Sequence, residues 1–220
     1  MSKTVSLIGV TGLIGSHLYE LLKKDTRIGT IRLIVRRPVP KDDPRVEIKL
    51  VDFADAESLQ LAIDGSDVVF CTIGTTQKKV KGDKEAYRKI DYDIPVHAAR
   101  CCKATGCGTF VLVSAVGANS KSSNFYLRLK GEVEDAVKGI GLRSVHFMRP
   151  SILLGARKEF RLGEKIGTVV MPVISFLFPA KYKAVHAQDV ARAMLAAANE
   201  NKDGVFVYEY REMRKLSNVQ

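Results

Sequence analysis

The sequence of 220 residues has no tryptophan, few cysteines and no long uninterrupted apolar segment. Its longest apolar run, residues 168–180, contains two prolines and is shorter than the roughly 18 residues that a membrane-spanning helix needs. A glycine-rich turn follows the first apolar stretch at once, so the amino terminus lacks a signal-peptide pattern. We therefore expect a cytoplasmic protein with no transmembrane segment, no metal site and four reduced thiols that match no zinc-binding spacing, Cys71, Cys101, Cys102 and Cys107.

Acidic residues are also scarce relative to basic ones. Aspartate and glutamate total 24 against 35 lysines and arginines, which gives a net charge of +11. A basic balance suits partners that carry phosphates or other anionic groups. The chain has no long basic run and no alternation of basic and aromatic residues, so we expect no nucleic-acid partner. Its length and ordinary apolar content predict a single domain, residues 1–220, as a monomer or a homodimer.

Strand-like and helix-like segments alternate along the first 150 residues. Nearly continuous apolar strands separated by helices are typical of a parallel sheet covered on both faces. Right-handed crossovers then give a doubly wound α/β fold, the Rossmann fold. Pro95 predicts a kink or a break in the third helix. We expect strands at residues 4–10, 31–36, 46–52, 67–74, 109–115 and 143–149, and helices at 13–24, 56–63, 83–105 and 124–138.

The pattern weakens after residue 150, where glycines and prolines interrupt the apolar stretches. We predict that residues 151–220 include a small substrate-side lobe of the same domain, with a helix at 189–199 and a last strand at 205–210. Asp189 is expected to cap that helix at its start. The final residues, 211–220, are polar and are expected to fray.

The first predicted strand runs into a glycine-rich turn with the spacing G-x-x-G-x-x-G, and a helix follows. The first glycine permits a tight turn, the second lets backbone N–H groups approach a pyrophosphate, and the third allows the helix to pack closely on the strand. The helix N-terminus adds a dipole that favours an anion. We predict that a dinucleotide binds here through Gly9, Thr11, Gly12, Leu13, Ile14 and Gly15.

Two arginines, Arg36 and Arg37, follow the second strand. Folds that are specific for NAD carry an acidic residue near this position, which binds the ribose 2′-hydroxyl. Guanidinium groups instead pair with a 2′-phosphate, and a charged contact of about 1.5–3 kcal/mol gives roughly a 10- to 150-fold preference. We predict that NADP(H) is preferred over NAD(H). The alternative is that both arginines are merely solvated.

Further cofactor contacts are expected where the third and fourth strands end. Asp52 is placed to accept a hydrogen bond from the adenine amino group, although a simple turn cap is the alternative. Gly74 lets the backbone lie against the cofactor. The predicted contacts in these two segments are Asp52, Phe53, Thr72, Ile73 and Gly74.

Three residues near the fifth strand fit the chemistry of carbonyl reduction. Ser114 ends that strand, and Tyr126 and Lys130 share one face of the next helix because they are four residues apart. A neighbouring ammonium and an oxidised nicotinamide would lower the pKa of Tyr126, so that it serves as general acid in reduction and base in oxidation. Lys130 would also bind the nicotinamide ribose, and Ser114 would polarise the substrate oxygen. The alternative is a surface tyrosine and lysine on an amphipathic helix.

Over roughly residues 4–200 the chain resembles the short-chain dehydrogenase/reductase superfamily, in particular its atypical NAD(P)-binding, Tat-interacting oxidoreductase-like branch. The resemblance implies a Rossmann domain that binds NADPH, the catalytic set Ser114, Tyr126 and Lys130, and a nicotinamide near the backbone of Arg149 and Pro150. An ion-pairing role for Arg149 is the alternative. The resemblance rests on the glycine turn, residues 71–76, Val113-Ser114, Ser122 to Glu134 and Arg149-Pro150.

The chain departs from this family at one position. Many members carry an asparagine before the fifth strand that supports a proton relay, whereas this sequence reads Ile90-Asp91-Tyr92-Asp93. Asp91 is the candidate replacement for this asparagine.

The predicted function is an NADPH-dependent oxidoreductase that acts on a small carbonyl compound or alcohol. Two alternatives stay open. One is an NADPH-binding sensor without catalysis that presents a surface to a protein partner, and the other is an isomerase similar to nucleotide-sugar epimerases. The basic loop at residues 77–84 is expected to be solvated, with a lid or a contact to an anionic partner as alternatives. The apolar run at 169–178 is expected to line the substrate pocket or to meet a partner or a membrane.

Overall fold

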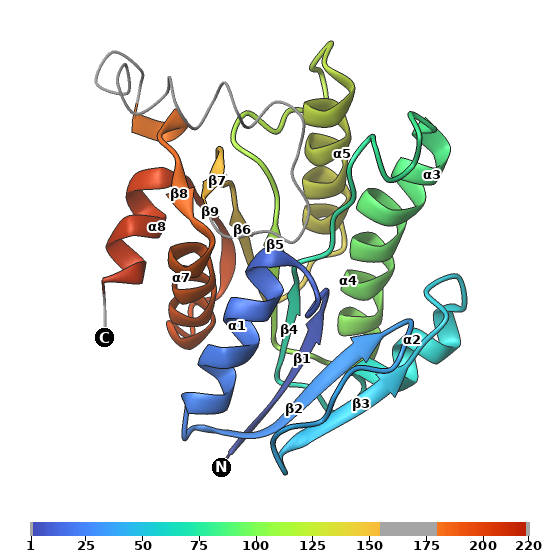
Figure 1. Ribbon diagram of the computed structural model, residues 1–220, viewed down its shortest axis with the longest axis vertical. Helices are drawn as coiled ribbons and strands as arrows, with labels where there is room; N and C mark the ends of the chain where they lie inside the picture. The colour runs from blue at the N-terminus through green and yellow to red at the C-terminus, as the bar shows by residue number, and fades with distance from the viewer. Residues whose placement is uncertain (1, 155–179, 219–220) are drawn as a thin grey trace.

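The computed structural model describes residues 2–154 and 180–218 and contains a seven-stranded sheet. All neighbouring strands in this sheet run parallel. Their order is β3-β2-β1-β4-β5-β6-β9 (Figure 1). The strand order therefore reverses between β1 and β4, which is the topological switch point of the sheet. The strands are β1 (Lys3–Ile8), β2 (Ile28–Val35), β3 (Val46–Leu50), β4 (Val68–Cys71), β5 (Thr109–Val113), β6 (Ser144–Met148) and β9 (Gly204–Tyr208).

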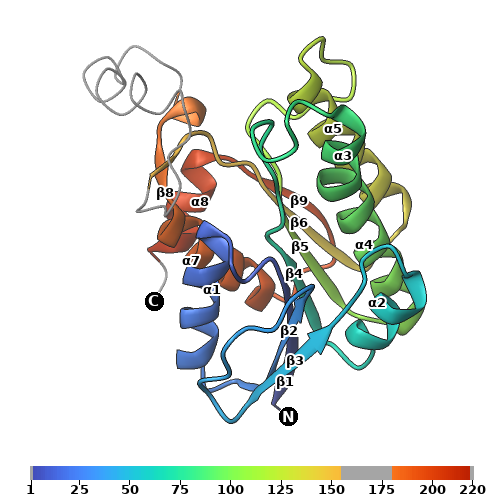
Figure 2. The ribbon, with the colours of Figure 1, turned by 45° about the vertical axis from the view of Figure 1, so that its right-hand side comes forward.

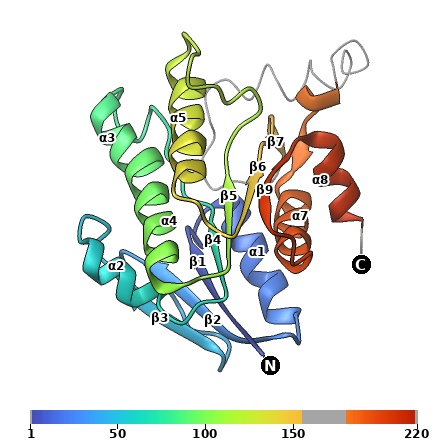
Figure 3. The same ribbon diagram turned by 180° about the vertical axis from the view of Figure 1, so that it is seen from behind.

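Helices cover both faces of the sheet, as Figures 2 and 3 show. One face carries α1 (Leu13–Lys24) and α7 (Ala187–Asn199), and the other carries α2 (Ala56–Ile63), α4 (Ile94–Thr105) and α5 (Phe125–Gly139). Successive strand residues point to opposite faces, so Leu7 belongs to the core under α1 while Ile8 belongs to the core under α4. This arrangement confirms the predicted doubly wound α/β fold.

The expected long helix at residues 83–105 is divided, as Pro95 predicts. It consists of α3 (Lys84–Arg88), a five-residue π-helical turn η1 (Lys89–Asp93) and α4, with Pro95 in the first turn of α4. A proline in the first turn needs no hydrogen-bonded N–H, so it begins a helix there without breaking one. The π turn buries Asp91, which becomes important for the site below.

The expected frayed end is wrong, because residues 210–217 form helix α8 (Tyr210–Ser217). Glu209 and Glu212 form a reciprocal capping box at its start, and Met213 is fully buried against the core. Asp189 does not cap α7, because that helix begins two residues earlier at Ala187. Its carboxylate instead pairs with Arg214 of α8 at 2.6 Å. A polar composition therefore concealed an amphipathic helix, which packs Met213, Tyr210 and Leu216 against the core and is joined to α7 by an ion pair.

The segment after residue 150 contributes to two parts of the structure. β9 pairs with β6 and completes the large sheet, whereas β7 (Leu153–Leu154) and β8 (Val185–His186) form a separate two-stranded sheet. A short 3-10 turn, η2 (Ala180–Tyr182), precedes β8. The apolar run at 169–178 lies outside the described residues. Within the two described ranges, no helix has the length and apolar character required to cross a bilayer.

Candidate functional site

The glycine turn between β1 and α1 leaves no room for a side chain at Gly9 or Gly15. Gly9 has a φ of +93°, and a Cβ there would lie 2.8 Å from Thr72 Oγ1 and 2.9 Å from the backbone nitrogen of Ile73. A Cβ on Gly15 would collide with the carbonyl oxygen of Gly9. The first and third glycines are thus required by a left-handed turn and by close helix–strand contact. The turn forms a compact backbone cradle, and its predicted contact with a pyrophosphate stays a prediction.

The N-terminus of α1 is open to an anion. Gly12 occupies the N-cap position, and among the described residues no side chain caps the helix. The first turn also carries no acidic residue. The Gly12 N–H donates to Gly9 O at 2.9 Å, which closes the turn and directs the next N–H groups, those of Leu13 and Ile14, along the helix axis. Thr11 lies exposed beside them. Uncapped N–H groups and the helix dipole together favour a bound phosphate.

The end of β4 supports the glycine turn from the neighbouring strand. The Thr72 hydroxyl donates to the carbonyls of Ile8 at 3.0 Å and Gly9 at 3.1 Å. Ile73 and Gly74 continue from it along the same edge of the sheet. Thr72 therefore positions the cradle, while its predicted contact with the cofactor stays a prediction.

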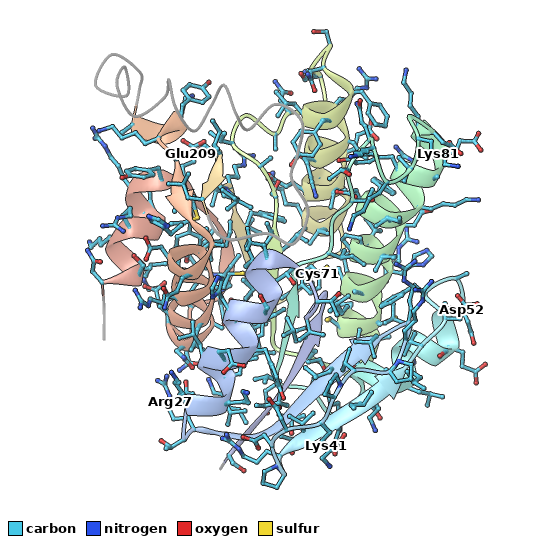
Figure 4. All side chains as sticks on the ribbon, viewed as in Figure 1. Arg27, Lys41, Asp52, Cys71, Lys81 and Glu209 are labelled. Carbon is cyan, nitrogen blue, oxygen red and sulfur yellow. The ribbon has the colours of Figure 1, made fainter. Side chains whose placement is uncertain are left out.

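Asp52 and Phe53 follow β3 at the far end of this edge. The Asp52 carboxylate accepts a hydrogen bond from the Ala54 N–H at 2.9 Å, so the turn-capping alternative is present in the structure. Asp52 is exposed beside α2 (Figure 4), whereas Phe53 is buried. The proposed contact of Asp52 with adenine requires only its second carboxylate oxygen and stays a prediction.

Arg36 and Arg37 lie exposed directly after β2. The other three arginines of the first 50 residues are each ion-paired, at distances of 2.6 to 2.9 Å from a carboxylate. By contrast, Arg36 and Arg37 have no carboxylate partner within the described residues. Two cations consequently remain available to an anionic ligand beside the strand end. The paired arginines are Arg27 with Asp25, Arg32 with Glu47 and Arg45 with Asp43.

Tyr126 and Lys130 lie one turn apart on α5 but differ in exposure. Asn124 caps the helix by accepting from the Leu127 N–H at 3.1 Å. Tyr126, in the first turn, is 37% exposed, whereas Lys130 is 5% exposed. Burial lowers the pKa of Lys130, but the negative charge of Asp91 and of an ionised Tyr126 raises it by more, so the net direction is upward. Lys130 therefore carries its proton and places a cation below the tyrosine.

Asp91 is the partner of Lys130, and it is 1% exposed. One carboxylate oxygen lies 3.0 Å from Lys130 Nζ, and the other accepts from the Thr75 N–H at 2.7 Å. Asp91 thus joins α5 to the loop that leaves β4. The sequence pattern indicates Asp91 only as a replacement for an asparagine, and it does not indicate the contacts with Lys130 and Thr75. The signal for its real contacts is the π turn, a geometry that is frequent at functional sites.

Ser114 lies in a second network. Its hydroxyl donates to Glu134 at 2.6 Å, and the two oxygens of Glu134 accept from Arg149 at 2.9 and 2.6 Å. Glu134 is 1% exposed and escaped the sequence analysis as a functional residue. No hydrogen bond found among the described residues joins Ser114 to Tyr126 or Lys130. The structure therefore brings Tyr126 together with Lys130 and Asp91, and Ser114 together with Glu134 and Arg149.

The backbone of Arg149 and Pro150 is held in place by the sheet. Arg149 N–H donates to Tyr208 O at 2.8 Å, and Pro150 O accepts from the Val116 N–H at 3.0 Å. The bidentate pair with Glu134 is the ion-pairing role that sequence analysis left open for Arg149. A cofactor contact of this backbone stays a prediction. In the part of the chain that the structure describes, no cluster of side chains is arranged to hold a metal ion.

Comparison with known proteins identifies relatives along nearly the whole chain. Residues 9–201 match the NAD(P)H-binding family. The chain is 31% identical to Protein FMP52, mitochondrial, of Candida albicans, over 96% of this chain and 97% of that protein. It is 32% identical to Protein HTATIP2 of Rattus norvegicus, over 88% of this chain and 80% of that protein.

A solved structure shares the fold. The Bordetella bronchiseptica enzyme WbmH in complex with NAD+ superposes with a TM-score of 0.73 at 20% identity, covering 96% of this chain and 76% of that one.

The expected cytoplasmic location is wrong. Relatives from Candida albicans, Debaryomyces hansenii and Meyerozyma guilliermondii, 31 to 34% identical to this chain, are all named as mitochondrial proteins. The expectation rested on a missing secretory signal and on reduced thiols. A signal-peptide pattern reports on secretion, and unpaired cysteines report on redox conditions, so neither separates one compartment inside the cell from another.

Proposed function

This chain belongs to the NAD(P)H-binding family, and from this premise we propose that it is an NADPH-dependent oxidoreductase that reduces a small carbonyl compound or oxidises the matching alcohol. The observation that carries the proposal is the exposed Tyr126 one turn from the buried ammonium of Lys130. Tyr126 follows β5 in a sheet whose strands all end at the edge where the glycine turn lies. Open parallel sheets bind their ligands at this edge.

The roles of the protein residues follow from the proton transfers that the reaction requires. NADPH, when bound, supplies the hydride that reaches the carbonyl carbon. The Tyr126 hydroxyl transfers its proton to the carbonyl oxygen, and the Lys130 ammonium stabilises the tyrosinate that is left. Asp91 holds Lys130 in place through their 3.0 Å ion pair. In the direction of alcohol oxidation, the same tyrosinate takes the proton back.

Ser114 has a narrower role than the family pattern implies. A hydroxyl has one proton, and that of Ser114 is directed at Glu134. We therefore infer that Ser114 meets a substrate oxygen as a hydrogen-bond acceptor, which suits a substrate alcohol better than a carbonyl.

The preference for NADPH over NADH is supported by Arg36 and Arg37. Both are exposed, and neither has a carboxylate partner among residues 2–154 and 180–218. Each guanidinium is free to pair with a ribose 2′-phosphate. Side-by-side titration of NADPH and NADH measures the preference, and tighter binding of NADH contradicts it.

A cofactor-sensing protein without catalysis is the second candidate. The separation of Ser114 from Tyr126 and Lys130 into a different hydrogen-bond network favours it. In this case the fold binds NADPH and presents a surface to a protein partner, and no carbonyl compound is turned over.

A panel of aldehydes and ketones, followed by the decrease in NADPH absorbance, separates the two candidates. Tyr126→Phe is expected to lower turnover about 10²- to 10⁴-fold, because it removes the proton donor. Tyr182→Phe is the matched control, since Tyr182 is similarly exposed and lies on η2. NADPH affinity is expected to be unchanged in both variants. Persistent NADPH binding with no turnover on any compound supports the sensor instead.

A further inference from the structure

Tyr87 on α3 packs against the two aromatic residues that begin α5. Figure 2 shows α3 beside the start of that helix. The ring of Tyr87 meets the ring of Tyr126 edge to face, with 6.5 Å between the centroids and 78° between the planes. It meets the ring of Phe125 in the same way at 5.8 Å. Edge-to-face pairs at these separations attract each other beyond the effect of burial, so Tyr87 restricts the position of both rings.

Tyr87 is buried without belonging to the apolar core. Its exposed fraction is 5%, yet it is in neither of the two apolar clusters that the described residues form on the faces of the sheet. A buried tyrosine hydroxyl needs a hydrogen-bond partner, and this one donates to Thr75 O at 3.2 Å. Contacts with α5 and with the loop after β4 therefore explain the position of Tyr87 better than packing on the sheet does.

Thr75 joins Tyr87 to the buried ion pair of Lys130. The carbonyl of Thr75 accepts from the Tyr87 hydroxyl, and its N–H donates to Asp91 at 2.7 Å. Asp91 in turn lies 3.0 Å from Lys130 Nζ. One residue of the loop after β4 thus ties the ring that contacts Tyr126 to the carboxylate that holds Lys130. The tyrosine and the lysine of α5 are supported by a single hydrogen-bonded unit.

An ion pair next to Tyr87 also holds α3 against α5. Arg88 Nη1 lies 2.6 Å from Glu132 Oε2. Both side chains are partly exposed, so this pair contributes little to stability and mainly fixes the geometry. Together with the contacts of Tyr87 and Asp91, it sets the distance between α3, η1 and α5. Tyr87 is therefore a fixed support for the first turn of α5.

Tyr126 itself has little else to hold it. Its side chain is 37% exposed, and no hydrogen bond found among the described residues engages its hydroxyl. An exposed side chain without a hydrogen bond samples several rotamers unless its neighbours restrict it. A displacement of about 1 Å at a reacting group can lower a rate substantially. The ring contact with Tyr87 is consequently a means of keeping Tyr126 in one position.

We propose that Tyr87 is a positioning residue, which holds the ring of Tyr126 one turn from the Lys130 ammonium, in the place from which its hydroxyl transfers a proton. The proposal rests on the proposed function, because it takes Tyr126 as the proton donor. Tyr87 touches neither substrate nor cofactor in this role and acts only through Tyr126.

Tyr87→Leu tests the proposal, because it keeps an apolar side chain and removes the ring. We expect kcat for carbonyl reduction to fall about 10-fold, as the loss of one aromatic pair allows. KM and NADPH affinity are expected to stay unchanged, because only the chemical step depends on the position of Tyr126. Tyr87→Phe keeps the ring and loses only the hydrogen bond to Thr75, and it is expected to restore most of the rate.

NMR of ¹³C-labelled tyrosine tests the same contact without turnover. The ring signal of Tyr126 is identified by its absence in Tyr126→Phe. The field of the neighbouring Tyr87 ring shifts this signal, so we expect Tyr87→Leu to move it toward that of a solvent-exposed tyrosine. Tyr87→Phe is expected to leave it in place. If the unmodified chain turns over no carbonyl compound, the proposed function fails, and this signal still decides whether Tyr87 holds the ring.

Tyr92→Leu is the matched control, because it removes a tyrosine ring from the same helical segment. Tyr92 lies on η1, and the Arg88 guanidinium lies 4.0 Å from the centre of its ring. This variant is expected to keep both kcat and the Tyr126 signal. If thermal melts show that Tyr87→Leu is unfolded at the assay temperature, Tyr87→Met replaces it, since a flexible thioether fills irregular space. An unchanged Tyr126 signal in the Tyr87 variant overturns the proposal, and so does an equal fall in kcat in the Tyr87 and Tyr92 variants.

Discussion

The two halves of the sheet present their functional groups in different ways. In the half around β1 and β2, backbone packing at Gly9 and Gly15 sets the shape, and Arg36 and Arg37 remain exposed. In the half around β5, β6 and α5, the groups are buried side chains that bind one another, as Lys130 does with Asp91. On one side a ligand therefore meets uncapped backbone N–H groups and arginines without a carboxylate partner among the described residues. On the other side it meets side chains that are already hydrogen-bonded or ion-paired.

Breaking the buried ion pair is expected to have the largest effect. Lys130→Met leaves Asp91 buried and unpaired, which costs about 3–5 kcal/mol of unfolding free energy. The double variant Asp91→Leu/Lys130→Met is expected to be more stable than Lys130→Met, because no uncompensated charge remains. Chemical denaturation measures both.

Arg143→Met is the control for this experiment, since its pair with Asp203 at 3.6 Å is largely exposed. It is expected to cost less than about 1 kcal/mol. Equal losses in Lys130→Met and Arg143→Met would contradict the contrast between buried and exposed pairs.

Stability at acid pH provides a second test of the comparison, because the half of the sheet with buried polar groups contains His146. This ring hydrogen-bonds Tyr208 at 3.0 Å and Ser144 at 2.9 Å, and burial lowers its pKa to about 4. The unfolded chain takes up this proton near pH 6.5, so between pH 6.5 and 4 the unfolded state binds more protons. Stability is full above that window and is lost as the pH falls through it.

We expect the unfolding free energy to fall by about 3 kcal/mol between pH 7 and 4 on account of His146. His146→Gln is expected to lose most of that pH dependence, and His17→Gln on α1 is expected to keep it. Denaturant titrations at each pH provide the measurement. An unchanged slope in His146→Gln would show that another group controls the acid response.

A methyl group at the third glycine tests the half that depends on the backbone. Gly15→Ala forces a Cβ into the Gly9 carbonyl oxygen. We expect this variant to lose about 1–3 kcal/mol of unfolding free energy and to lose NADPH binding. Gly139→Ala in α5 has open space around it and is expected to be neutral or stabilising by up to about 1 kcal/mol. Thermal melts and NADPH titration follow both variants. Retained NADPH binding in Gly15→Ala would refute the cradle.

The smallest effect is expected at the exposed arginines. Arg36→Ser and Arg37→Ser should each weaken NADPH binding about 10-fold, which is about 1.4 kcal/mol, and leave NADH binding unchanged. Arg27→Ser, which removes an ion-paired arginine at the other end of β2, should change neither affinity. Fluorescence titration with the two cofactors measures these affinities. An equal loss of affinity for NADPH and NADH would contradict the prediction that Arg36 and Arg37 bind the ribose 2′-phosphate.

The first half of the site could be predicted from sequence because its determinants are local. Glycine spacing, a following helix and two adjacent arginines are all readable within residues 9–37. Periodicity likewise located α1 and α2 at their observed bounds. The second half depends on contacts between distant segments. Lys130 and Asp91 are 39 positions apart, and Glu134 meets Ser114 across 20, so no local pattern indicates either pair.

Helix α8 was missed for a related reason. Met213 is the one fully buried apolar side chain among its eight residues. The helix is further stabilised by its capping box and by the ion pair of Arg214 with Asp189 on α7. Tertiary contacts outweigh a polar composition in such a segment.

The π turn η1 also determines which residues of the following helix, α4, face the core. Such a turn holds about one residue more than an α turn, so α4 is rotated by about 100° relative to an uninterrupted helix. In this phase Val96, Ala99 and Cys102 face the core while Asp91 faces Lys130. Deleting a single residue from Lys89–Asp93 would restore ordinary helix geometry and force one of the two faces to turn away. The extra residue lets the helical segment 84–105, interrupted only by this turn, contact both the apolar interior and the edge of the sheet where Lys130 lies.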